Sequence, residues 1–194
     1  MSTTAADFAS GLAFSYAMVD DIAISYMKRL REQPSVEALD YVRCNRMFQE
    51  RMAYEHLFSD ILLATATGEV LASGRTDAPT TIAPILKSIP RLSEKIHRGE
   101  LYSGKPYKEP VVPYVLGLHS DSGGKPQFAL VLLLRSAVYG SVSGKLETPQ
   151  GMNYSLLDRS GRFVFRFPLP SASETGETIY PGIWEQIKGG RDDH

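Results

Sequence analysis

Several features that mark large classes of proteins are scarce or absent in this sequence. One cysteine, Cys44, occurs in 194 residues, so no disulfide can form within the chain. The formal net charge of −1 at pH 7 argues against a nucleic-acid-binding protein, which carries a basic patch or a high pI. No run reaches the roughly 18 apolar residues of a membrane span. The first residues lack the basic region and apolar core of a secretory signal, so we expect either a cytoplasmic protein or a segment whose flanking sequence is not included.

The sequence motifs of catalysis and metal binding are also missing. No pair among the four histidines, His56, His97, His119 and His194, has the spacing of metal ligands. There is no GxSxG nucleophile elbow, no phosphate-binding P-loop and no GxGxxG. Asp158 stands at a strand end, where a carboxylate caps a turn more often than it catalyses. We therefore expect no enzymatic activity, no metal and no cofactor.

The N-terminal quarter of the chain predicts helices. From about Thr4 to Arg31 apolar residues recur every three or four positions, which predicts one amphipathic helix about 40 Å long. Such a helix either lies on its own sheet or serves as a spine or dimer contact. A second helix is expected from about Val36 to Tyr54, capped by Ser35 or Asp40, with Cys44 buried inside it.

Two similar stretches predict β-hairpins. In Asp60–Gly74 two apolar runs flank a turn in which Gly68 takes the left-handed conformation. The pattern returns in Asn153–Phe167, where Gly161 corresponds to Gly68 at an offset of 161 − 68 = 93 residues. This offset is about the size of a small domain, so we expect each hairpin to open a sheet.

Between the hairpins the chain reads first as helical and then as β-structure. Helix is expected at Thr80–Arg98, either kinked or divided into short separate helices by two prolines, and a short helix or linker at Ser136–Leu146. The strands between them are predicted at Leu101–Lys108, Val111–Ser120 and Gln127–Arg135. The last of these is apolar on both faces and should be central in the sheet. Beyond the second hairpin, Ile179–Lys188 is expected to form a short helix. The fold class is therefore α+β, with an antiparallel sheet flanked by helices.

A candidate ligand site lies in the stretch LYSGKPYKEPVVPY, residues 101–114. Tyrosine hydroxyls and lysine amines on two adjacent strands suit an anionic or zwitterionic small molecule. Arg135, at the end of the central strand, adds a guanidinium that can bind a carboxylate through two bonds. The predicted ligand-binding residues are Tyr102, Lys105, Tyr107, Tyr114 and Arg135. The alternative is a solvated edge strand, in which lysines and prolines are common.

The order of these elements resembles the double Cache family, the PAS-like extracytoplasmic sensor domains of bacterial histidine kinases, diguanylate cyclases and chemoreceptors. The family pattern P-x-V…D…C is matched by Pro34, Val36, Asp40 and Cys44, and its L-I-D-x-x-G-x-V pattern by Leu156, Leu157, Asp158, Gly161 and Phe163. The first hairpin departs from the pattern, with Thr65 where the family has Asp. The Arg-x-Trp-Tyr element of the amino-acid-binding subgroup is also absent, so the resemblance does not imply an amino-acid ligand.

The resemblance implies three parts: a helical spine at 1–55, a membrane-distal PAS-like sensor domain at 56–148, and an incomplete membrane-proximal PAS-like region at 149–194. It implies a small-molecule ligand, such as a carboxylate, in the distal domain, with the long helix transmitting the signal. It further implies a homodimer formed through that helix, on the periplasmic or extracellular side of an inner membrane that only flanking segments would reach. A kinase or cyclase output domain would lie elsewhere in the protein. Two alternatives stay open: a PAS-like protein-interaction or dimerisation module without a small-molecule ligand, and a cytoplasmic PAS-like domain that holds a cofactor.

Overall fold

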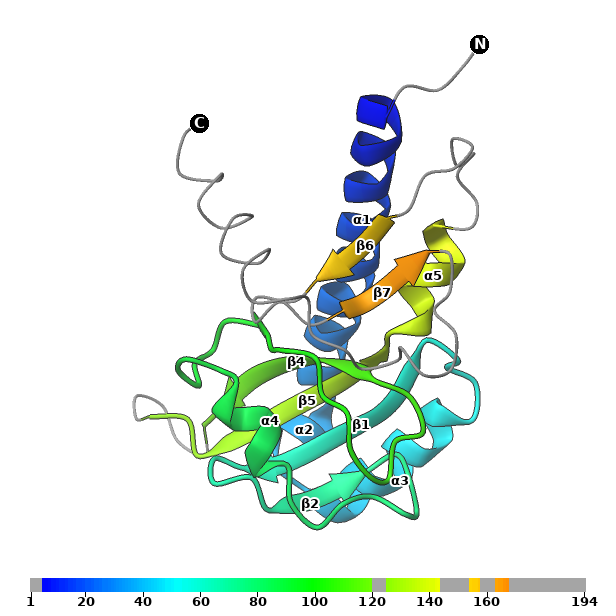
Figure 1. Cartoon of the computed structure of the whole chain (residues 1–194). Helices are drawn as coiled ribbons and strands as arrows, with labels where there is room; N and C mark the ends of the chain where they lie inside the picture. The colour runs from blue at the N-terminus through cyan, green and yellow to red at the C-terminus, as the bar shows by residue number, and fades with distance from the viewer. Residues whose placement is uncertain (1–4, 120–124, 144–153, 158–162, 168–194) are drawn as a thin grey trace.

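The fold is α+β, as predicted: a long helix, an antiparallel sheet with short helices around it, and a separate hairpin (Figure 1). The structure is a computed structural model, and it describes residues 5–119, 125–143, 154–157 and 163–167. The helix expected at Ile179–Lys188 lies outside these residues.

Helix α1 spans Ala5–Arg31, which confirms the long N-terminal helix. Its buried stripe has the predicted spacing and consists of Phe8, Leu12, Val19, Ala23, Tyr26, Met27 and Leu30. The C-terminal half lies on the sheet, while the N-terminal half projects past it and lies beside the second hairpin (Figure 1). There the ring of Phe8 meets the ring of Tyr154 edge to face at 5.1 Å.

The second predicted helix is divided in two. Helix α2 spans Pro34–Glu37 and helix α3 spans Tyr41–Met52. Leu39 between them has φ +50°, a left-handed conformation that a continuing helix does not allow. Asp40 then caps α3 by accepting a bond from the Arg43 N–H at 3.1 Å, as one of the two predicted caps. Cys44 is fully buried in α3, as expected.

One five-stranded antiparallel sheet carries the fold, in the order β2-β1-β5-β4-β3. Its strands are β1 (Phe58–Thr65), β2 (Val70–Ser73), β3 (His97–Arg98), β4 (Val111–Leu118) and β5 (Phe128–Arg135). Strand β5 is central, as its apolar sequence predicted. Leu130, Leu132 and Leu134 pack toward the core beneath α1, α2 and α3. Ala129, Val131 and Leu133 pack toward a second core, beneath helix α4 (Ala83–Lys87).

One of the predicted elements between the hairpins is confirmed only in part, and one is wrong. The stretch Thr80–Arg98 holds the short helix α4, with Pro84 in its first turn, and then strand β3 where helix was expected. The stretch Leu101–Lys108 is a loop rather than a strand. It touches the sheet through one isolated bridge, between Tyr102 and Val111.

The two predicted hairpins are both present. Strands β1 and β2 form the first, and β6 (Tyr154–Leu157) and β7 (Phe163–Phe167) form the second. Gly68 has φ +97° and closes the first turn, as expected. Gly161 and Asp158 lie outside the described residues. A short helix, α5 (Ala137–Ser143), follows β5 and packs against α1 and β7.

Replacing Gly68 by alanine should destabilise the fold. Its backbone is left-handed, and a Cβ there would lie 2.5 Å from the backbone nitrogen of Ala83, so strain and collision both oppose the side chain. We expect Gly68→Ala to lower the free energy of unfolding by about 2–4 kcal/mol in urea denaturation. Glu69→Ala is the matched control, since that side chain is exposed in the same turn. Equal stability of the two variants would contradict the strain argument.

Candidate functional site

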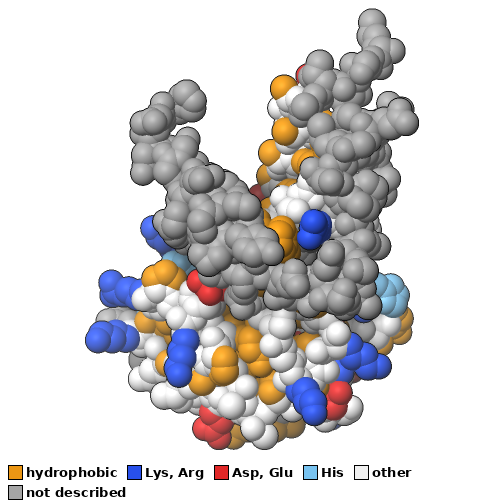
Figure 2. Space-filling model, in the orientation of Figure 1, with side chains coloured by type: hydrophobic (Ala, Val, Ile, Leu, Met, Phe, Trp, Pro, Cys, Tyr) orange, Lys and Arg blue, Asp and Glu red, His pale blue; other side chains and the backbone are white. Residues whose placement is uncertain are grey.

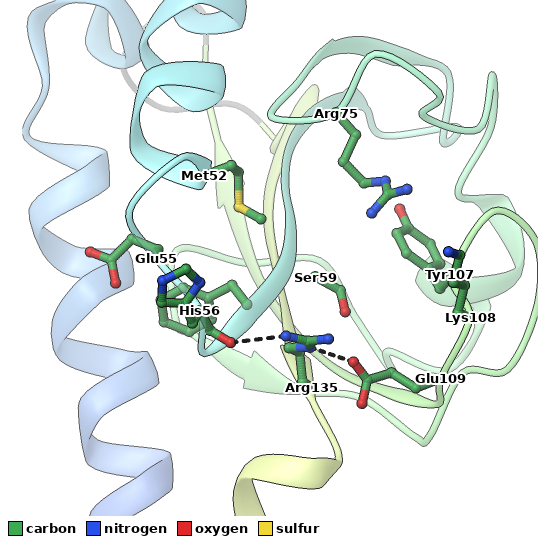
Figure 3. A pocket seen from close by; sticks show the side chains of 10 residues that line it. Met52, Glu55, His56, Ser59, Arg75, Tyr107, Lys108, Glu109 and Arg135 are labelled. Atoms are coloured by element: carbon green, nitrogen blue, oxygen red, sulfur yellow. Dashed lines mark hydrogen bonds and ion pairs between the residues drawn. The ribbon is translucent and has the colours of Figure 1, made fainter.

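A cavity of about 310 Å³ opens at the edge of the sheet where β1 begins and β5 ends. Figure 3 shows that its lining side chains come from the end of α3, the link before β1, the start of β1, the link after β2, the loop before β4, and the last residue of β5. They are Met52, Glu55, His56, Phe58, Ser59, Arg75, Tyr107, Lys108, Glu109 and Arg135. Antiparallel pairing of β1 with β5 brings these segments together, because Phe58 stands opposite Leu134.

Positive charge predominates in the lining. It contains three cationic side chains, Arg75, Lys108 and Arg135, and two carboxylates, Glu55 and Glu109. The Nε of Arg135 donates to Glu109, and its Nη1 donates to the His56 carbonyl oxygen at 3.3 Å (Figure 3). These contacts hold the guanidinium across the mouth of the cavity.

Arg75 forms a second anchored guanidinium. It donates two bonds to the carboxylate of Asp77, at 2.8 and 2.7 Å. These bonds hold the pKa of Asp77 below its ordinary value. The same guanidinium lies 5.9 Å from the ring centre of Tyr107, within cation–π range. Figure 3 shows it on the side of the ring that carries the hydroxyl.

The Tyr107 side chain separates the cavity from a fully buried carboxylate, that of Asp60. It accepts bonds from the N–H of Ile61 at 2.8 Å, the hydroxyl of Ser73 at 2.9 Å, the N–H of Gly74 at 3.1 Å and the Tyr107 hydroxyl at 3.2 Å. Burial raises the pKa of Asp60 to about 6, against the opposing effect of the bonds from Ser73, Ile61, Tyr107 and Gly74. Burial and the nearby Asp60 charge also raise the pKa of Tyr107.

The structure brings together part of the predicted site. Tyr107 and Arg135 line the same cavity. Tyr102 supports them from outside the lining, with its ring edge to face against Tyr107 at 6.2 Å. Lys105 is exposed on the loop and does not line the cavity.

Tyr114 lies on the opposite face of the sheet, in the core beneath α1. Its hydroxyl donates to Asp20 of α1 at 2.5 Å, and the hydroxyl of Tyr139 in α5 donates to the same oxygen at 2.7 Å. Arg98 of β3 pairs with the other oxygen of Asp20 at 3.5 Å. Burial, together with the neighbouring Tyr139 and Asp20, raises the pKa of Tyr114. Tyr114 therefore joins the sheet to the helices and lies away from the cavity.

Sequence reasoning missed the contribution of the first hairpin, for which it predicted no site residue. Asp60, Ser73 and Arg75 all lie in or beside this hairpin. The sequence signal was the carboxylate of Asp60 directly before the run Ile61–Ala64, since a charge at the start of a fully buried strand needs partners.

The cavity lies at the rim of the sheet. Between the sheet and α4, apolar side chains pack together, among them Leu62, Ile82, Ile85, Val115 and Val131. All five are buried. The polar cavity is therefore beside this core rather than within it.

Two further findings concern the described residues as a whole. Within them, no group of three or more His, Cys, Asp or Glu side chains is arranged to hold a metal ion. None of their helices combines the length and the apolar character needed to cross a membrane.

Comparison with known proteins identifies the fold. No protein-family model and no curated protein sequence matches the chain. Solved structures do match. A domain of a protein assigned to the sensory box/GGDEF family of Vibrio parahaemolyticus is 16% identical with a TM-score of 0.61, over 93% of this chain and 80% of that one. The sensor domain of the Vibrio cholerae histidine kinase DctB is 10% identical with a TM-score of 0.61, over 93% and 72%.

A third match is the ligand-binding domain of the Campylobacter jejuni chemoreceptor Tlp3, solved in complex with L-valine. It is 15% identical with a TM-score of 0.55, over 81% of this chain and 68% of that one. The chain therefore has the fold of the sensor domains of signalling receptors. The resemblance to the double Cache family is confirmed in its fold.

The stability of the protein should depend on the pH through Asp60. The folded state holds this proton up to about pH 6, whereas the unfolded chain releases it near 3.8. The folded state then binds more protons in this window, so the free energy of unfolding decreases as the pH rises through it, by about 3 kcal/mol from this one group.

Asp60→Asn, which cannot titrate, isolates the effect from other groups. We expect the stability of the wild type relative to this variant to fall as the pH rises from about 4 to about 6.5, in urea denaturation. A difference that is constant over this range, or that rises with pH, would show that Asp60 is ionised throughout.

Proposed function

We propose that this chain is the extracytoplasmic ligand-sensing domain of a bacterial signalling receptor, and that the domain itself is not an enzyme. Its ligand is a small organic anion, with a carboxylate as the favoured class. The fold shared with sensor domains supports the general role. The observation that carries the choice of ligand is the convergence of Arg75, Lys108 and Arg135 on one cavity.

The two arginine ion pairs in the lining are suited to exchange with a ligand. The side chain of Arg135 is 44% exposed, and Asp77, the partner of Arg75, is 59% exposed. Exposed ion pairs contribute only about 0–1 kcal/mol, so a bound carboxylate can replace Glu109 or Asp77 at little cost. A guanidinium then holds the ligand through two parallel bonds. The volume, about 310 Å³, suits a small molecule.

Binding can reach α1 through β4. The loop that supplies Tyr107 and Lys108 leads directly into Val111, the first residue of β4. Three residues later, Tyr114 holds Asp20 of α1. A ligand that favours one position of the loop would thereby bias the position of α1, provided that it binds the two states with different affinities.

The proposed division of the chain remains a helical spine at 1–55, a sensor domain at 56–148 and a second PAS-like region at 149–194. The second region is supported by the β6–β7 hairpin, which packs on α5 and α1. In a receptor, this arrangement places one helix in contact with both regions.

Removing Arg135 should weaken ligand binding. We expect a screen of small mono- and dicarboxylates to raise the melting temperature of the wild type. Arg135→Ala should then raise the Kd of the best compound at least tenfold, the usual cost of about 1.4 kcal/mol or more for a lost charged bond. Isothermal titration calorimetry measures the effect, and Arg135→Lys should restore it only in part, because lysine lacks the forked donors.

Arg46→Ala is the matched control, since Arg46 is exposed on α3 and outside the cavity lining. A screen in which no carboxylate stabilises the protein, or equal affinity of the Arg135→Ala and Arg46→Ala variants, would count against the proposed ligand site.

A second candidate function is a PAS-like interaction or dimerisation module without a small-molecule ligand. The apolar packing between the sheet and α4 favours it, because that region is filled by the protein's own side chains. An exposed apolar stripe on α1 favours it as well. Phe14 is 68% exposed, Met18 47% and Ile22 45%, at intervals of four residues. Figure 2 shows apolar side chains exposed along the projecting part of the helix.

Under either function we propose a homodimer formed through this stripe. Met18→Glu should shift the protein from dimer to monomer in light scattering coupled to size exclusion, because a charge in an apolar helix contact is costly to bury. Val42→Glu, at an exposed apolar position on α3, is the control and should leave the mass unchanged. A wild type that is monomeric at every concentration would refute the dimer.

A further inference from the structure

The buried Asp60 carboxylate lies next to the cavity without a cation bonded to it. It is completely buried, and its hydrogen bonds come from four neutral donors, one of which, the Ser73 hydroxyl, contacts both oxygens. Among the described residues no ion pair includes it. The guanidinium of Arg75 interacts with Asp60 electrostatically, but its hydrogen bonds go to Asp77. The hydrogen bonds to the Asp60 carboxylate therefore come from neutral groups only.

The charged and titratable groups around this corner come from every segment packed against it. They are Glu55 and His56 before β1, Arg75 and Asp77 after β2, Tyr107, Lys108 and Glu109 in the loop, and Arg135 at the end of β5. An anion bound in the cavity adds a second negative charge close to that of the Asp60 carboxylate, from which the Tyr107 side chain separates it.

The two oxygens of Asp60 have different donors. Oδ1 accepts from the two N–H groups, of Ile61 and Gly74, which can only donate, and from the Ser73 hydroxyl at 2.9 Å. Oδ2 faces two hydroxyls, of Ser73 at 3.0 Å and Tyr107 at 3.2 Å. A hydroxyl can either donate or accept. A proton on Oδ2 therefore leaves both N–H bonds intact and only reverses a hydroxyl bond.

We propose that the cavity takes up its anion together with one proton from solvent, which binds to Oδ2 of Asp60. This inference rests on the proposed anion site and adds its regulation. When Oδ2 carries the proton, it donates to the Tyr107 oxygen, and the single Tyr107 hydrogen is released for a bond to the anion. The proton also neutralises the Asp60 carboxylate on the other side of the Tyr107 side chain. Both effects raise affinity for the anion.

The coupling is reciprocal, so protonation strengthens anion binding by the factor by which the anion favours protonation. Burial already brings the pKa of Asp60 to about 6, so the protonated form is accessible near neutral pH. Anion affinity should therefore rise as the pH falls, with Asp60 as the group that takes up the proton.

The test uses 1,2-ethanedisulfonate, whose two sulfonates stay ionised over the whole range, so that the probe itself does not titrate. Isothermal titration calorimetry on the full chain should show affinity rising as the pH falls from about 8 to about 6, by up to about tenfold for each pH unit. Asp60→Asn should bind more tightly than the wild type at the high end and lose the pH dependence. Cationic buffers are needed, because sulfonate buffers would compete for the site.

His56 lines the same cavity and is the control, because a histidine can also take up a proton. His56→Gln should retain the pH dependence. In this variant, titrations in two buffers of different ionisation enthalpy should show net proton uptake, approaching one proton for each anion. This second measurement decides the matter even if Asp60→Asn fails to fold.

The outcomes separate the two proposals. Binding of the disulfonate or a carboxylate with no proton uptake, or a pH dependence that His56→Gln abolishes and Asp60→Asn retains, overturns the proton coupling and leaves the anion site standing. If neither probe binds at any pH, the anion site itself is wrong and the coupling falls with it.

Discussion

The burial of strand β5 on both faces is the constraint on which the structure depends. A strand that is apolar on both sides must have a neighbour on each edge and a cover on each face. Strands β1 and β4 supply the neighbours, the helices α1 to α3 cover one face, and α4 with the loop before β4 covers the other. The sheet therefore separates two cores. A conformational change on one face can reach the other face only through the strands.

A carboxylate accepts several hydrogen bonds on each side of the sheet, Asp20 at the margin of one core and the buried Asp60 beside the other. Asp20 on the helix side is bonded by two tyrosine hydroxyls and pairs with Arg98. Asp60 on the loop side is bonded by neutral donors alone. The first joins elements that apolar contacts would leave free to slide, because hydrogen bonds have direction. The second brings the loop, through Tyr107, to the first hairpin. Apolar contacts thus drive the packing of these elements, and the polar contacts fix their positions relative to one another.

Much of the fold follows from local patterns, but less of the site does. The helical period of α1, the turn at Gly68 and the apolar run of β5 each depend on neighbours in sequence, so they could be predicted. Arg135 could be predicted as a site residue for the same reason, because it ends a strand that the sequence identifies. The loop at 101–108 was mistaken for a strand, so the place of Tyr107 could not be deduced. The strand that carries Tyr114 was predicted, but β4 is buried along its whole length, so its sequence does not show which face meets the helices. The partners of Asp60, Ser73 and Tyr107, lie 13 and 47 residues further along the chain, where only the folded sheet brings them near.

The turn at Gly68 has a consequence for how the cavity side of the sheet can deform. The Gly68 carbonyl oxygen accepts a bond from the N–H of Ile82 at 2.7 Å, and its backbone lies close against Ala83 at the start of α4. The hairpin and α4 are therefore joined main chain to main chain and form one stiff unit, which reaches the cavity through Phe58 and Ser59 at the start of β1. The loop before β4 also lines the cavity and is bonded to that strand through Gly99 and Tyr102. A bound ligand would therefore be accommodated by movement of the loop that carries Tyr107, while the hairpin stays in place.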